Sequence, residues 1–178
     1  MKLFDFKKYK IIQNKIGDLT ADYTHYFTEG QWSSYELLLY ILSITGKAKV
    51  ILTSYSISDI TIRTIKKAIE ADYISSIDLL LNYSVKRNKV DLLYFSSNVI
   101  NKIALNNNHS KIMIIENDNY KIMVNQSANA TVNYSDESGI VCTKHDIYHI
   151  YKENIEKLFN EKTIIKKNEF IRRTACRH

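Results

Sequence analysis

The feature that most constrains the fold is an alternation of helical and extended segments in the first half of the chain. Helical segments here carry one apolar face, whereas the extended segments are short and apolar throughout, which is typical of buried strands. In order, the pattern predicts a helix at 34–45 ended by Gly46, a strand at 48–53, a helix capped by Ser58 or Asp59 with Ile65 and Ile69 on one face, and a strand at 75–82. Strands that alternate with helices favour an α/β fold.

The rest of the chain continues this pattern. It predicts a strand or hairpin within 18–28, a polar helix at 85–100, two strands joined by a turn at 116–119, a short strand near 139–143 and an amphipathic helix from 147 to 159. These elements predict one α/β domain with a mixed sheet. We divide the chain into an N-terminal extension at 1–33, the domain at 34–161 and a basic tail at 162–178.

Charge and apolar content limit the function classes. The 178 residues, 45% of them hydrophobic, suffice for one core, and the formal charge of +6 favours polyanionic partners. The longest apolar run, 35–42, is far shorter than the roughly 20 residues that a bilayer span needs. Two cysteines cannot build a multi-bridge framework, and the Lys-rich start has no long apolar core. We therefore expect a cytoplasmic protein without a transmembrane segment.

Candidate site residues follow one another along the second half of the chain. His109 and Lys111 stand two positions apart before an apolar run, so in a strand they would share one face. Because lysine is abundant here, this pair alone carries little information. Ser127 and Asn129 follow the next predicted strand, and Glu137 directly precedes the short strand near 139–143. The order of the three elements is more informative than any one of them.

Together, HSKIMIIE, QSANAT and DESGIV resemble the phospholipase D superfamily. Its signature is His-x-Lys with an acidic residue five positions after the lysine, then Gly-Ser-x-Asn and a downstream Glu. The resemblance covers about 103–141 and implies a mixed sheet flanked by helices on both faces and a phosphodiesterase. Glu116 stands where Asp is usual, at a mostly structural position, and Gln126 where Gly is usual. Because a side chain replaces glycine, we expect a narrower or differently shaped phosphate pocket.

The residue types suit phosphodiester cleavage. An imidazole is partly unprotonated at neutral pH, so His109 can attack phosphorus, and the Glu137 carboxylate can fix its tautomer. Lys111 and Asn129 can bind the non-bridging oxygens, and Ser127 adds a hydroxyl donor. Since the sequence shows no tetrahedral metal cage, we expect a reaction through a covalent phosphohistidine without metal or cofactor.

The signature occurs once in this chain. In the family, a second histidine from a second copy of the motif protonates the leaving group, and short members with one copy pair two chains about a two-fold axis. The resemblance therefore implies a C2 homodimer in which His109 and Lys111 of both subunits form one composite site.

Nucleic acid is the expected substrate, because short single-copy relatives are typically nucleases. Basic residues that could contact a phosphate backbone are Lys86, Arg87, Lys89 and Lys102 in the domain and Lys166, Lys167, Arg172, Arg173 and Arg177 in the tail. Surface solvation explains such charges equally well. The sequence does not distinguish DNA from RNA.

Three other interpretations stay open. The altered Gln126 position allows a catalytically impaired module that binds nucleic acid or acts as a scaffold. Phospholipid hydrolysis ranks third, because no long amphipathic membrane-binding helix is evident. Cys142, His145 and His149 could also ligate zinc, although no fourth ligand lies nearby in sequence.

Overall fold

The computed structural model describes residues 5–160 and 163–165. The strands are β1 Tyr23–Phe27, β2 Ala48–Ser54, β3 Ile74–Asn82, β4 Lys102–Asn106, β5 Ile112–Glu116, β6 Lys121–Gln126, β7 Ser138–Cys142 and β8 Thr163–Ile165. The helices are α1 Phe6–Ile16, α2 Ser34–Thr45, α3 Asp59–Glu70, α4 Ser84–Asn88, α5 Val90–Ser97 and α6 His145–Asn160. The strands form one mixed sheet in the order β1-β7-β6-β5-β2-β3-β4-β8.

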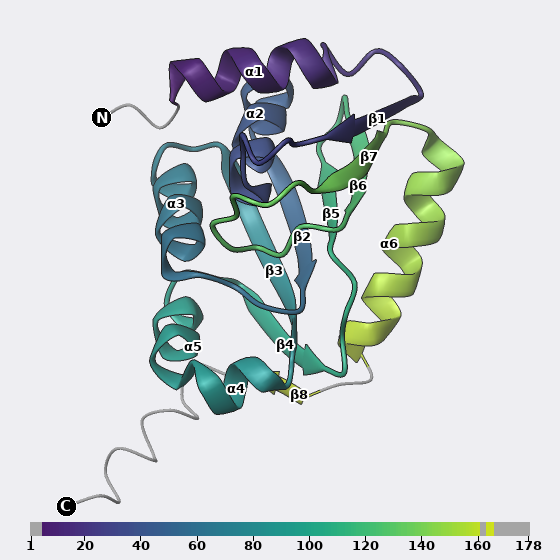
Figure 1. Ribbon diagram of the computed structural model, residues 1–178. Helices are drawn as coiled ribbons and strands as arrows, with labels where there is room; N and C mark the ends of the chain where they lie inside the picture. The colour runs from purple at the N-terminus through teal and green to yellow at the C-terminus, as the bar shows by residue number, and fades with distance from the viewer. Residues whose placement is uncertain (1–4, 161–162, 166–178) are drawn as a thin grey trace, which may run out of the picture.

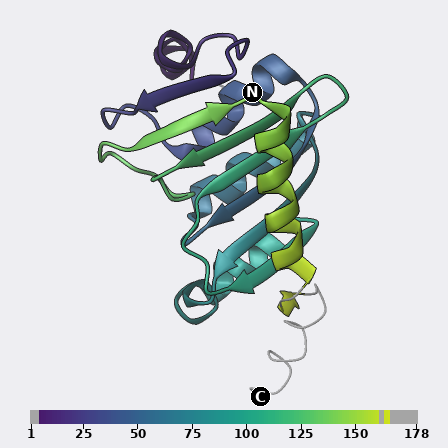
Figure 2. The same cartoon turned by 90° about the vertical axis from the view of Figure 1, so that its right-hand side faces the viewer.

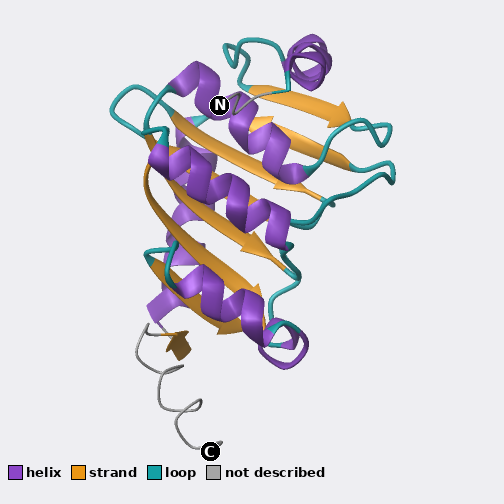
Figure 3. Ribbon diagram, turned by 90° about the vertical axis from the view of Figure 1, so that its left-hand side faces the viewer, coloured by secondary structure: helices purple, strands orange, loops and turns teal. Residues whose placement is uncertain are grey.

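Helices cover both faces of this sheet, as the sequence predicts. α6 crosses one face, which Figure 2 shows, whereas α2, α3 and α5 cover the other, which Figure 3 shows. The larger core lies under α1 to α5, and a smaller one lies between the sheet and α6. Successive residues of a strand point to opposite faces, so each central strand contributes to both cores.

Local sequence signals explain the elements that were predicted correctly. At the start of α2, the Glu36 carboxylate accepts from the Ser33 N–H (2.7 Å), and Gly46 ends the helix at a φ of 73°. Ser58 caps α3 by accepting from the Thr61 N–H (3.3 Å). Such signals act over only a few residues, which is why the sequence reveals them.

Three predictions about the elements were incomplete. The predicted helix at 85–100 is two helices, α4 and α5, and β4 follows it although the sequence pattern missed it. β4 has the same length and burial pattern as β5, which was predicted, so neither explains why it was missed. Residues 163–165 of the predicted tail form β8, which pairs with β4.

The N-terminal extension adds a helix and a strand to the domain. The predicted strand within 18–28 is observed at 23–27 as β1, which pairs with β7 at one edge of the sheet. α1, which was not predicted, packs across α2 through Ile12 and Ile16 (Figure 1).

Strand directions bring several loops together at one edge of the sheet. β2, β3 and β4 are parallel and end there; β5 and β7 start there, and β6 and β1 end there. We call this the carboxyl edge; its segments are 28–33, 55–58, 83, 107–111 and 127–137. All five predicted catalytic and phosphate-binding residues lie on these segments. Within 5–160, no helix is both long and apolar enough to cross a membrane.

Candidate active site

The segment that carries His109 is fixed by two buried asparagines. Asn82, the last residue of β3, donates from Nδ2 to the carbonyl oxygen of Asn108 (3.0 Å). The Asn108 Oδ1 accepts from the Ser110 hydroxyl (2.6 Å), and Ser110 also hydrogen-bonds Thr53 at the end of β2 (2.9 Å). Buried amides with satisfied hydrogen bonds hold a single loop conformation. The loop therefore presents His109 to solvent at a fixed place.

His109 and Lys111 lie just before β5 and not in a strand, but their side chains still lie next to each other, as predicted. Lys111 is 9% exposed and turns back, so that its Nζ donates to the His109 carbonyl oxygen (2.7 Å) and lies 3.4 Å from Nδ1. The ring of Tyr55 lies 5.2 Å from the imidazole, centroid to centroid. Burial lowers the pKa of Lys111, and the charge of Glu137 acts in the opposite direction.

Glu137 is held by neutral donors. Its carboxylate accepts from the Ser127 hydroxyl and from the Asn133 amide, and the Ser127 oxygen in turn accepts from the Ser138 N–H (3.0 Å). Among the described residues, no cation lies within ion-pair distance of Glu137, and none of its hydrogen bonds goes to His109. The contact expected to fix the imidazole tautomer is therefore not made in this structure.

Asn129 is positioned by the β2–α3 loop. Its Oδ1 accepts from the Ser54 hydroxyl (3.3 Å), and the N–H of the following Ala130 donates to the same Ser54 oxygen (2.9 Å). Ala130 also pairs with Ile57 in an isolated parallel bridge. The amide Nδ2 of Asn129 has no partner among the described residues, so it can donate to a ligand.

Gln126 does not narrow a phosphate pocket. Its side chain is 9% exposed and points into the fold, where Oε1 accepts from the Tyr26 hydroxyl (2.9 Å) and Nε2 donates to Ser34 (2.7 Å). The side chain joins β1 to α2 instead, so the expected narrowing by Gln126 is not seen, whereas a differently shaped phosphate pocket stays a prediction. Burial raises the pKa of Tyr26, which keeps the hydroxyl protonated as the donor.

Glu116 lies at the opposite edge of the sheet, under α6. It accepts hydrogen bonds from Tyr148 and from Lys152 (2.7 Å), and Lys121 lies 3.7 Å away. Burial raises the pKa of Glu116, but the hydrogen bonds from Lys152 and Tyr148 lower it. The net effect is a pKa below the ordinary carboxyl value. This arrangement agrees with a structural position.

The predicted basic contacts divide into two groups. Lys86 and Arg87 are exposed on α4, directly after the carboxyl end of β3. Lys89 instead donates to Ser56 (2.9 Å) and to the Ile57 carbonyl (2.7 Å), so it supports the loop that carries Tyr55. Lys102 starts β4 at the opposite edge, 5.0 Å from the Phe159 ring centroid. The five basic residues of the tail lie outside the described residues.

The residues of the zinc alternative do not converge. His145 and His149 approach each other on α6 (2.9 Å between the Nε2 atoms), but Cys142 is fully buried in the core under α6. Within the described part of the chain, no three residues of metal-ligating type form a group.

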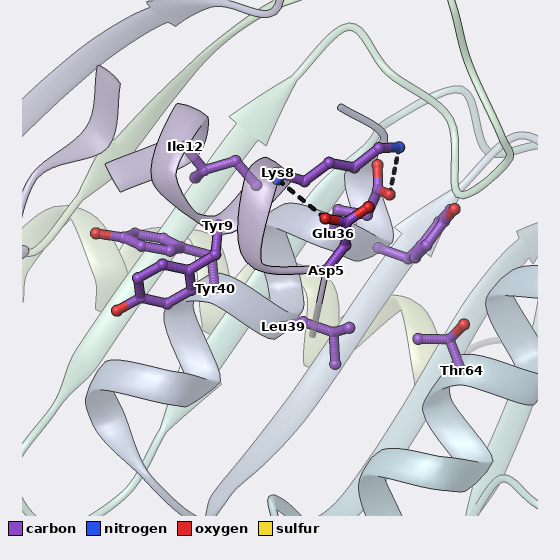
Figure 4. Close-up of a pocket in the computed structure, with 9 residues that line it drawn as sticks. Asp5, Lys8, Tyr9, Ile12, Glu36, Leu39, Tyr40 and Thr64 are labelled. Carbon is purple, nitrogen blue, oxygen red and sulfur yellow. Dashed lines mark hydrogen bonds and ion pairs between the residues drawn. The ribbon is translucent and has the colours of Figure 1, made fainter. Parts of the chain in front are cut away.

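A crevice of about 130 Å³ lies near the N-terminus, between α1, the start of α2 and Thr64 of α3 (Figure 4). Its charged groups are already engaged: Lys8 Nζ pairs with Glu36 (2.6 Å), and Asp5 caps α1 by accepting from the Lys7 N–H (2.9 Å). None of the predicted site residues lines it. We interpret this crevice as a packing gap where α1 meets α2.

The sequence missed three residues that build the site: Asn82, Asn108 and Asn133. Asn82 and Asn108 are polar residues at or beyond the ends of apolar strands, and that position is the signal that could have identified them. Nothing in the sequence links Asn133 to Glu137.

No protein-family model matches the sequence, and no curated protein matches it. Solved structures do. Nuc from Salmonella typhimurium, described as a phospholipase D family member, aligns with a TM-score of 0.58 at 15% identity over 81% of this chain and 97% of that chain. NucT from Helicobacter pylori aligns with a TM-score of 0.60 at 17% identity, over 79% of this chain and 98% of that chain. A polyphosphate kinase from Porphyromonas gingivalis aligns with a TM-score of 0.61 at 13% identity, over 84% of this chain but only 28% of that chain.

The chain has the fold of the phospholipase D superfamily. The predicted fold class is confirmed, and this likeness in fold agrees with the resemblance seen in the motifs. Nuc and NucT are matched over almost their full length, so the phospholipase D fold here corresponds to the whole of these two chains. At these low identities the comparison concerns the fold, and the activity must be argued from the site.

Proposed function

We propose that the protein is a phosphodiesterase that cleaves nucleic acid without a metal ion, with His109 as nucleophile. The observation that carries this proposal is the buried ammonium of Lys111 beside the exposed imidazole of His109, at an edge where Ser127 and Asn129 add neutral donors. A buried cation with few competing partners is a strong binder of a phosphate oxygen. The exposed Lys86 and Arg87 at the same edge support a polyanionic substrate.

In the proposed reaction, Nε2 of His109 attacks phosphorus and forms a P–N bond while the bond to the leaving oxygen breaks. His109 of the partner subunit donates a proton to that oxygen. Water then attacks the phosphohistidine, His109 of the partner subunit removes the water proton, and the P–N bond breaks. Lys111 and Asn129 hold the non-bridging oxygens throughout.

The second histidine requires the homodimer. We expect light scattering after gel filtration at micromolar concentration to give the mass of two chains. A strict monomer would remove the proton donor and contradict the composite site.

Cleavage assays test the reaction itself. Wild type and His109→Ala are incubated in EDTA with plasmid, single-stranded DNA, RNA and a chromogenic phosphodiester. We expect cleavage by wild type alone, because the reaction needs the imidazole and no metal. A strict requirement for added Mg²⁺ would reject histidine as the nucleophile.

One observation favours a second candidate, a module that binds nucleic acid without cleaving it. Nδ1 of His109 faces the Lys111 ammonium, not a carboxylate, so this geometry favours the tautomer whose proton is on Nε2. Such an imidazole cannot attack phosphorus until Lys111 moves onto a phosphate oxygen. Binding without cleavage by both wild type and His109→Ala would support the module.

A further inference from the structure

A cavity of about 320 Å³ opens beside Ser127, on the face of the sheet that α6 crosses. It lies where β1, β6 and β7 meet the carboxyl edge. Its lining consists of His25, Tyr26, Phe27, Asn125, Gln126, Ser127, Ser138, Gly139 and Ile140. Ser127 also donates to Glu137, so the cavity adjoins the candidate phosphate site directly.

The aromatic side of the cavity comes from alternation along β1. Tyr26 points into the fold, where it is 3% exposed, so its neighbours His25 and Phe27 point out on the α6 face. Phe27 is 61% exposed, an unusual state for a phenylalanine next to a polar site. Phe27 pairs in register with Ser138, whose N–H holds the Ser127 oxygen. The ring therefore lies one residue pair away from a proposed phosphate ligand.

One polar group in the lining is open to a ligand. The Asn125 amide donates to the Tyr151 hydroxyl (3.3 Å), and its Oδ1 accepts no hydrogen bond from the described residues. One exposed ring and one open carbonyl suit a flat ligand with a donor at its edge.

The lining carries no Asp, Glu, Lys or Arg, so the cavity is not built for a second phosphate or a lipid headgroup. We propose that it binds an unpaired nucleobase adjacent to the scissile phosphate, with Phe27 as the stacking platform. The inference rests on the proposed function, because a phosphate bound beside Ser127 determines the position of the neighbouring nucleobase. Stacking on an aromatic side chain tolerates every base, so affinity without sequence preference follows.

Binding of two oligomers with the same phosphates tests this subsite. Oligothymidylate and an abasic oligomer of equal length are titrated by fluorescence anisotropy in EDTA, in the non-cleaving His109→Ala background. We expect Phe27→Ala to weaken binding of oligothymidylate about 10-fold and to leave the abasic oligomer unchanged. Phe27→Trp should restore the preference. Tyr23→Ala is the matched control, because Tyr23 lies on the same face of β1, is 43% exposed and does not line the cavity.

Two results would overturn the subsite. One is equal weakening of both oligomers, or of neither, by Phe27→Ala. The other is a Phe27→Ala protein that becomes monomeric while wild type is dimeric, which would assign the ring to a subunit interface. The proposed function fails if wild type does not cleave the substrates. That result does not affect the binding comparison, which uses the non-cleaving His109→Ala background.

Discussion

Two glutamates of this protein occupy opposite edges of one sheet and have opposite surroundings. Glu116 ends β5 under α6 and accepts from Lys152 and Tyr148. Glu137 precedes β7 at the carboxyl edge, and its carboxylate accepts only from Ser127 and Asn133 among the described residues. One carboxylate is therefore paired with a cation, whereas the other has no cation within ion-pair distance among the described residues.

This difference separates a structural role from a chemical one. A carboxylate paired with a cation stabilises the fold but has little capacity left for a substrate. A carboxylate held by neutral donors stays available to orient a nucleophile or a cation in the site. The same substitution, Glu to Gln, should therefore act on stability at one edge and on activity at the other.

The largest effect is expected at the carboxyl edge. Glu137→Gln should reduce phosphodiester cleavage about 100-fold, because the site loses the negative charge that acts on the Lys111 ammonium. Its midpoint of denaturation should change little, since the amide can keep one of the two hydrogen bonds. Steady-state cleavage and urea denaturation of the same preparation measure both effects. Unchanged cleavage would place Glu137 outside the reaction.

Glu116→Gln should reduce stability and leave cleavage unchanged. We expect a loss of about 2 kcal/mol in the free energy of unfolding at neutral pH, because hydrogen bonds to a charged group are lost and Lys152 is left without this partner. Cleavage per folded molecule should equal that of wild type. A large loss of activity in the folded variant would mean that the two edges are coupled.

The smallest expected effect is a pH dependence of the difference in unfolding free energy between wild type and Glu116→Gln. The pKa of Glu116 is lowered in the fold, so its ionised form stabilises the protein above the ordinary carboxyl value of 4.5. This contribution should disappear as the pH falls through the lowered value, and Glu116→Gln should then equal wild type. Urea denaturation at several pH values measures the convergence. A difference that stays constant to low pH would contradict the ion pair.

The sequence predicted the parts of this fold that depend on local signals. α2 and α3 have caps within a few residues, and α6 has a clear apolar face. α1 escaped prediction because it is mostly polar, whereas β4 was missed although it is as long as β5. Tertiary packing, not propensity, determines both.

For the site, the order of the motifs predicts His109, Lys111 and Glu137, but contacts between residues distant in sequence cannot be predicted from local patterns. Gln126 bonds Ser34, which is 92 residues away, and this contact directs its side chain into the core. The local sequence shows only that Gln126 stands where glycine is usual. The structure thus removes the main reason to expect an impaired phosphate pocket.

The most direct test of the central claim is a search for a covalent phosphohistidine. Wild-type protein is mixed with excess oligonucleotide in EDTA, quenched under alkaline denaturing conditions within the first turnover, and analysed by peptide mass spectrometry. We predict a nucleotide adduct on the peptide that contains His109, absent in His109→Ala. Cleavage without any adduct on that peptide, or an adduct on another residue, would contradict the account.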